Sequence, residues 1–115
     1  MERTDRDKRA HPRVTVFRPL IYRSEIYPKV RAAFTLDLSP NGARIENTSH
    51  FYSHERLNLW FSFEPRIVHC TGRVVHVQDL GEKISAGICF ESMNDDDRVA
   101  LTQYLSDLVT QTTES

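Results

Sequence analysis

The sequence predicts a six-stranded antiparallel β-barrel with a C-terminal α-helix. Three observations support this fold class. Residues 13–91 contain short stretches in which apolar and polar side chains alternate, as in strands with one buried face. Residues 94–110 instead repeat their apolar side chains at helical spacing. The chain has 115 residues, which suits one domain, and closure of the sheet into a barrel removes exposed strand edges.

The N-terminal residues 1–12 contain almost no apolar side chains and end at Pro12, so we expect a flexible basic arm before the first strand. A solvated arm with no ligand is the alternative explanation of its charges. The single barrel domain, helix included, is expected over residues 13–110, and a frayed tail over 111–115.

Six strands are expected after the arm, separated by turn residues. Their ranges are 13–23, 29–38, 42–47, 56–63, 66–77 and 83–91. In the second of them, Phe34, Leu36 and Leu38 are expected to face the core. The run from Ser39 to Gly42 predicts a type I turn followed by a glycine in the left-handed conformation.

A helix is expected over about 94–110, since Asn94 is a good N-cap and the acidic run 95–97 suits the positive end of a helix better than a metal site. Its apolar positions are Leu101, Tyr104, Leu105 and Leu108. Trp60 alternates with core positions, so we expect it to pack under this helix or, alternatively, to be exposed for a partner.

Composition excludes several protein classes. With 39% hydrophobic residues, 27% charged residues and a net charge of −1, the chain is not collagen-like, disordered or a strongly basic nucleic-acid-coating protein. Its apolar stretches are far shorter than the roughly 20 residues that cross a bilayer, and its N-terminus is charged. We therefore expect a cytoplasmic protein without membrane insertion.

The cysteines and histidines do not form a recognisable metal or disulfide pattern. Cys70 and Cys89 lie far apart without a C-x-x-C spacing, and both are expected to be free, buried thiols. His50 and His54 are four residues apart in a predicted loop, but the sequence positions no third ligand. No arrangement of serine, histidine and acidic residues indicates a nucleophile, so we expect neither a metal site nor an enzyme.

The first candidate motif is the R-x-x-x-R spacing of Arg9 and Arg13 at the entrance of the first strand. Twelve of the fifteen basic residues are arginine, whose planar guanidinium group binds phosphate or a base edge in bidentate fashion. An arm that carries two such groups could close over an anionic ligand on the barrel surface.

The second candidate motif is D-x-S-x-x-G, formed by Asp37, Ser39 and Gly42. This pattern is expected by chance less often than the R-x-x-x-R spacing. Asp37 and Ser39 are expected on one strand face, where a carboxylate can accept the ring and amino N–H groups of guanine. Gly42 would allow a close approach that a side chain obstructs. The alternative is that Asp37 and Ser39 only stabilise the turn.

The two motifs in this order, with the late strand that contains Gly87 and a closing helix, resemble the PilZ family of bacterial cyclic di-GMP receptors. The resemblance covers residues 9–109 and implies a six-stranded barrel, no cofactor, no catalysis and cyclic di-GMP as ligand. The ligand-binding residues that it implies, position by position, are Arg9, Arg13, Asp37, Ser39 and Gly42. The basic neighbours Arg6, Lys8 and Arg44 are added to this set; at the position of Lys8, arginine would match the family more closely.

We therefore expect a stand-alone receptor or adaptor domain that binds cyclic di-GMP, orders its arginine arm and signals to a downstream protein. One alternative is a PilZ-like barrel that serves as a protein-interaction module without nucleotide binding. A single-strand nucleic-acid binder would need several surface aromatic residues along a basic groove, so no nucleic-acid polymer is expected as a partner.

Overall fold

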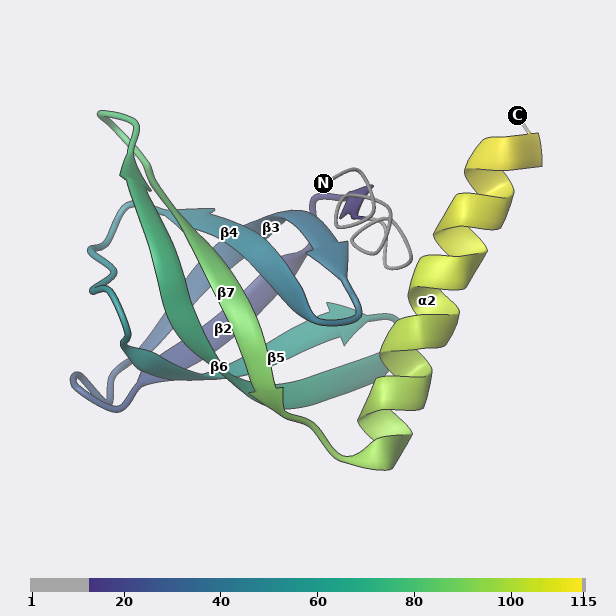
Figure 1. Cartoon of the computed structure of the whole chain (residues 1–115), viewed down its shortest axis with the longest axis horizontal. Coiled ribbons are helices and arrows are strands. Elements are labelled where there is room, and N and C mark those ends of the chain that lie inside the picture. The colour runs from purple at the N-terminus through teal and green to yellow at the C-terminus, as the bar shows by residue number, and fades with distance from the viewer. Residues whose placement is uncertain (1–12, 115) are drawn as a thin grey trace, which may run out of the picture.

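The computed structural model describes residues 13–114 and has a closed antiparallel barrel with one helix across its end (Figure 1). The elements are β1 (Val14–Thr15), β2 (Pro19–Ser24), β3 (Val30–Ser39), β4 (Gly42–Asn47), β5 (Arg56–Phe63), β6 (Arg66–Asp79), β7 (Ile84–Ser92) and α2 (Asp95–Glu114). The sheet runs β3-β2-β5-β6-β7-β4, and pairing of β3 with β4 closes it. The predicted six-stranded barrel with a C-terminal helix is confirmed; the predicted arm, 1–12, lies outside the described residues.

The first predicted strand is divided into β1 and β2, because a threonine side chain separates its two halves. The Thr35 hydroxyl accepts the Arg18 backbone N–H at 2.8 Å and donates to the Val16 carbonyl oxygen. The backbone N–H of Thr35 also donates to the Arg18 carbonyl oxygen at 2.9 Å. Both halves pair with β3 in succession, so together they still contribute one side of the barrel.

The expectation that Phe34, Leu36 and Leu38 all face the core is wrong for Phe34, whose exposure is 55%. The register between β3 and β4 shifts between Thr35 and Asp37, as at a β-bulge. An extra residue reverses the alternation, so Thr35 is buried before the shift and Leu38 after it. The bulge leaves Asp37 on the outer face.

The core fills the barrel with apolar side chains from the six strands and the helix. Its completely buried members include Leu38, Ile45, Leu59 and Val68. Cys70 belongs to the same core, and burial raises the pKa of its thiol to about 12. The expectation that both cysteines are buried is wrong for Cys89, which is exposed because it alternates on β7 with inward-facing neighbours.

Helix α2 begins as the sequence predicts. The Asn94 side-chain oxygen accepts the Asp97 backbone N–H at 2.8 Å, which is an N-cap contact. The buried Asp97 carboxylate also accepts the Arg66 guanidinium and the His69 backbone N–H, each at 3.2 Å, and so attaches the helix to β6. The helix continues past the expected end at residue 110, since the chain has no glycine or proline there.

No helix within residues 13–114 has both the length and the apolar character needed to cross a membrane.

Trp60 does not pack under the helix, and that expectation is wrong. Its ring is partly exposed on the outer barrel face and stacks on His69 at a centroid distance of 5.0 Å. The ring that meets the helix is Phe63, which stacks on Tyr104 at 4.2 Å. The reason is that α2 covers the end of the barrel, whereas the outward positions of β5 lie along its side (Figure 1).

Candidate functional site

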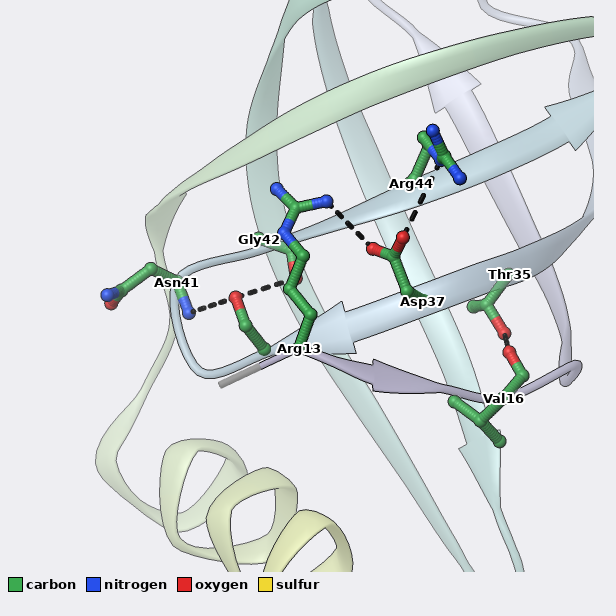
Figure 2. A network of polar contacts seen from close by, with 8 residues as sticks. Arg13, Val16, Thr35, Asp37, Asn41, Gly42 and Arg44 are labelled. Carbon is green, nitrogen blue, oxygen red and sulfur yellow. Dashed lines mark hydrogen bonds and ion pairs between the residues drawn. The ribbon is translucent and has the colours of Figure 1, made fainter. Parts of the chain in front are cut away.

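Two guanidinium groups flank one carboxylate on the outer face of the barrel (Figure 2). Arg13 Nη1 donates to Asp37 Oδ1 at 2.9 Å, and Arg44 Nε lies 3.6 Å from Asp37 Oδ2. The Asp37 side chain is only 13% exposed, against 58% for Arg13 and 47% for Arg44. Since most guanidinium N–H groups remain open to solvent, the cluster has a positive charge in excess and free donors.

Strand pairing brings these three side chains together from separate parts of the chain. Asp37 pairs with Thr15 of β1 on one side and with Arg44 of β4 on the other. Arg13 immediately precedes β1, so the pairing of Val14 with Leu38 fixes where its side chain begins. The β1–β3 ladder therefore determines where Arg13 lies relative to Asp37.

Ser39 lies at the turn between β3 and β4, where its hydroxyl holds the backbone. Ser39 Oγ accepts the Asn41 backbone N–H and donates to the Gly42 carbonyl oxygen, both at 3.3 Å (Figure 2). The Ser39 side chain is nearly buried. In this structure Ser39 thus has the turn-stabilising role that the sequence left open as an alternative.

Gly42 is required for a different reason from the one that the turn pattern predicted. It does not have the left-handed conformation; among the described residues, positive φ occurs only at His54 and Gly81. A Cβ atom at Gly42 would instead lie 2.4 Å from the carbonyl oxygen of Ile88. Close passage of β7, which pairs with β4, leaves no room for a side chain here.

The turn is also attached to the helix and to β7. Arg98 of α2 donates to the Pro40 carbonyl oxygen at 3.1 Å, and the Phe90 backbone N–H donates to the Asn41 carbonyl oxygen at 2.9 Å. These contacts hold the turn from α2 and from β7, so the motif is built on a fixed support.

A glycine lies beside Arg44 on the neighbouring strand. Gly87 of β7 is the direct neighbour of Arg44 on β4 and of His76 on β6. Because Gly87 has no side chain, it places no Cβ atom between the outward positions of Arg44 and His76. The sequence named Arg44 and Gly87 separately, but only the strand register places them beside each other and beside His76.

The structure brings Arg13, Asp37 and Arg44 into contact and places Ser39 and Gly42 in the adjoining turn. The other candidate residues, Arg6, Lys8 and Arg9, lie outside the described residues. In the described part of the chain, no three histidine, cysteine, aspartate or glutamate side chains gather as metal ligands. The chemistry available to this cluster is recognition of an anion by guanidinium groups and of N–H donors by a carboxylate.

The fold and the site define a small β-barrel domain that carries two guanidinium groups and a carboxylate on its outer surface. The PilZ domain family matches residues 7–107, so the chain belongs to the PilZ domain family. No curated protein matches its sequence.

Solved structures show the same fold at low sequence identity. The Bacillus subtilis inhibitor of motility MotI/DgrA has a TM-score of 0.76 at 18% identity, covering 90% of this chain and 52% of that one. YcgR from Escherichia coli, in complex with c-di-GMP, has a TM-score of 0.77 at 11% identity, covering 93% and 48%. The K. pneumonia MrkH–c-di-GMP complex has a TM-score of 0.75 at 14% identity, covering 92% and 54%. The chain thus spans about half the length of these proteins.

Proposed function

We propose that this PilZ domain is a receptor for cyclic di-GMP, which it binds on the outer barrel face around Asp37. The observation that carries the proposal is the position of Asp37 between the guanidinium groups of Arg13 and Arg44. Family membership and the c-di-GMP complexes of YcgR and MrkH support the choice of ligand.

The arginines would bind the phosphate groups. A guanidinium group has five N–H donors, and Arg13 uses one of them on Asp37. That contact turns Arg13 towards the site before a ligand arrives, which reduces the entropy lost on binding. The exposed ion pair is weak, whereas a charge-assisted phosphate contact is stronger, so the guanidinium can add or exchange partners at little cost. Arg9 of the same motif supplies the second guanidinium in this proposal.

Asp37 would read the base. Its carboxylate can accept the ring N–H and the amino N–H of guanine, which are adjacent donors on one edge of that base. Adenine lacks this pair of donors and presents a ring acceptor in its place. The surface over Gly87 could hold the plane of the base between Arg44 and His76.

We expect the wild-type domain to bind cyclic di-GMP at least about tenfold more tightly than cyclic di-AMP, because the wrong base leaves the Asp37 carboxylate without its donors. Asp37→Ala should weaken binding of cyclic di-GMP and bring the two affinities together. Isothermal titration calorimetry on both variants with both dinucleotides measures this.

Asp79→Ala is the matched control, since Asp79 is an exposed carboxylate at the end of β6. Among the described residues its side chain accepts only the Gly81 backbone N–H. This variant should bind both dinucleotides as the wild type does. Equal affinity of the wild type for the two dinucleotides would contradict base reading by Asp37. Failure of the wild type to bind cyclic di-GMP more tightly than GMP or a short oligonucleotide would instead favour the protein-interaction module.

Signal output would come from the arginine arm. Phosphate contacts of Arg9 and Arg13 give residues 6–13 fixed partners, and these contacts must exceed the cost of about 1–2 kcal/mol per residue for backbone ordering. The ordered arm and the adjacent barrel surface would form a composite face for a downstream protein. The domain then acts by binding, without catalysis.

We expect cyclic di-GMP to increase amide hydrogen-exchange protection in residues 6–13 and in the turn from Ser39 to Gly42, while the rest of the barrel changes little, because its packed core has one arrangement. Mass-spectrometric exchange with and without ligand measures this. An arm equally protected in both states, or changes concentrated in α2, would contradict the arm mechanism.

A further inference from the structure

The β2–β3 turn and the β4–β5 loop lie at the end of the barrel opposite α2 (Figure 1). Residues of both segments line a cavity. Its volume is about 280 Å³. Since a water molecule takes about 30 Å³ in the liquid, the cavity suits a ligand of roughly ten heavy atoms. Arg31, which lines it, lies six positions before Asp37 on β3, so the cavity is about 20 Å from the cyclic di-GMP site at 3.3 Å per residue.

A buried carboxylate without a cationic partner forms part of the cavity wall. Glu55 is 6% exposed and accepts the Tyr52 backbone N–H at 2.8 Å and the Ser24 hydroxyl. Within the described part of the chain it forms no ion pair. Two hydrogen bonds leave about half of the acceptor capacity of a carboxylate unused, and a buried charge is costly until a cation pairs with it.

Arg31 provides the complementary charge in the same cavity. It is the cross-strand neighbour of the inward-facing Tyr22, and its Nη1 donates to the Ser49 hydroxyl at 2.9 Å. No carboxylate of residues 13–110 lies within ion-pair distance of it, and that includes Glu55. The cavity therefore holds one unpaired cation and one unpaired anion that are too far apart to neutralise each other.

Aromatic rings form the outer wall of the cavity. The Tyr52 ring lies 6.3 Å from that of Tyr27 and 6.0 Å from that of His50. The neighbouring Tyr27 phenol is the main cause that raises the pKa of Tyr52. Tyr27 and Tyr52 are about half exposed, whereas Glu55 is buried, so the rings lie nearer the entrance than the carboxylate does.

The backbone holds the carboxylate in place independently of its own hydrogen bonds. His54 has a φ of 70°, in the left-handed region that a non-glycine residue rarely occupies. Its N–H donates to the Val74 carbonyl oxygen at 2.7 Å, and the Val74 N–H donates to the Glu55 carbonyl oxygen at 2.8 Å. Because β6 fixes this loop, replacement of the Glu55 carboxylate by an amide should leave the fold intact.

We propose that this cavity binds a free α-amino acid, with its ammonium group on Glu55, its carboxylate on Arg31 and its side chain along the rings of Tyr27 and Tyr52. An amine without a carboxylate would leave the guanidinium unpaired, and an acid without an ammonium group would bring a second negative charge near Glu55. In a peptide the two charged groups are on different residues, so a free amino acid fits the paired charges best. The site is independent of the cyclic di-GMP surface.

The test is thermal-shift screening of the whole domain against the twenty L-amino acids, each added singly, followed by calorimetry of those that bind. We expect at least one to bind with a Kd below about 1 mM. Arg31→Gln and Glu55→Gln should each weaken its binding about tenfold or more, since each removes one charge-assisted contact. Arg23→Gln is the matched control, because Arg23 lies on the outer face of β2 and is exposed.

The amine and the carboxylic acid that correspond to the bound amino acid complete the test. Both should bind at least about tenfold more weakly than the amino acid itself. Absence of binding by all twenty amino acids overturns the proposal. Undiminished affinity in Arg31→Gln also overturns the proposal; Arg31 is a hydrogen-bond donor in the structure, so this variant removes no buried acceptor. Equal binding of the amine overturns it as well and would define a site for organic cations.

Discussion

Replacement of Arg13 by alanine should weaken cyclic di-GMP binding about ten- to a hundredfold and leave the melting temperature almost unchanged. The loss of one charge-assisted, bidentate contact costs about 1.5–3 kcal/mol of binding free energy. Stability should hardly change, because Arg13 is 58% exposed and its ion pair with Asp37 is of the surface kind, worth about 0–1 kcal/mol. Asp37 also keeps Arg44 as a partner. Calorimetry and thermal unfolding on the same preparation measure the two effects.

Arg23→Ala is the matched control for Arg13→Ala, since it removes an exposed arginine from β2 away from Asp37. It should bind cyclic di-GMP as the wild type does. A loss of equal size in both variants would mean that only general positive charge attracts the ligand. Unchanged affinity in Arg13→Ala would remove Arg13 from the binding site and favour a purely structural role for its contact with Asp37.

Gly42→Ala should destabilise the domain by about 1–3 kcal/mol, because the new Cβ atom would lie 2.4 Å from the Ile88 carbonyl oxygen. That oxygen belongs to the backbone of β7, so it cannot move away as a flexible side chain could. The melting temperature should fall by roughly 4 °C for each kcal/mol in a domain of this size. Cyclic di-GMP affinity should fall as well, since the turn that holds Ser39 must shift.

Gly87→Ala is the control that separates close approach from the mere loss of a glycine. Gly87 lies on the strand next to β4, and its nearest neighbour for a new Cβ atom is the His76 Cβ at 3.5 Å, an ordinary contact. The free energy of unfolding of Gly87→Ala should equal or slightly exceed that of the wild type, because alanine loses less backbone entropy on folding than glycine does. Equal destabilisation of the two variants, or a stable Gly42→Ala, would contradict the steric argument.

Local patterns in the sequence predicted those parts of the fold that depend on near neighbours. The alternation of apolar side chains placed β4 and β5 at the bounds that the structure has, because a strand with one buried face imposes that period. Asn94 and the acidic run after it predicted the start of the helix, since an N-cap contact spans only three residues. The motif residues Arg13 and Asp37 were also evident, because their types and spacing lie within the sequence itself.

Other features depend on residues that are distant in sequence. The bulge that turns Phe34 outward arises where β3 changes register against β4, and Trp60 lies on the side of the barrel because α2 crosses only its end.

The sequence by itself determined the strand and helix pattern, the barrel class and the arginine and aspartate motifs. Only the tertiary structure decided that Gly42 is required by the Ile88 carbonyl oxygen and not by its own φ, that Arg44 adjoins Asp37, and that Gly87 adjoins Arg44. It also brought Arg31 and Glu55 into one cavity. The physical reason is that period and capping are local properties of a chain, whereas steric contact and charge pairing across strands depend on register, which is fixed only when the whole barrel closes.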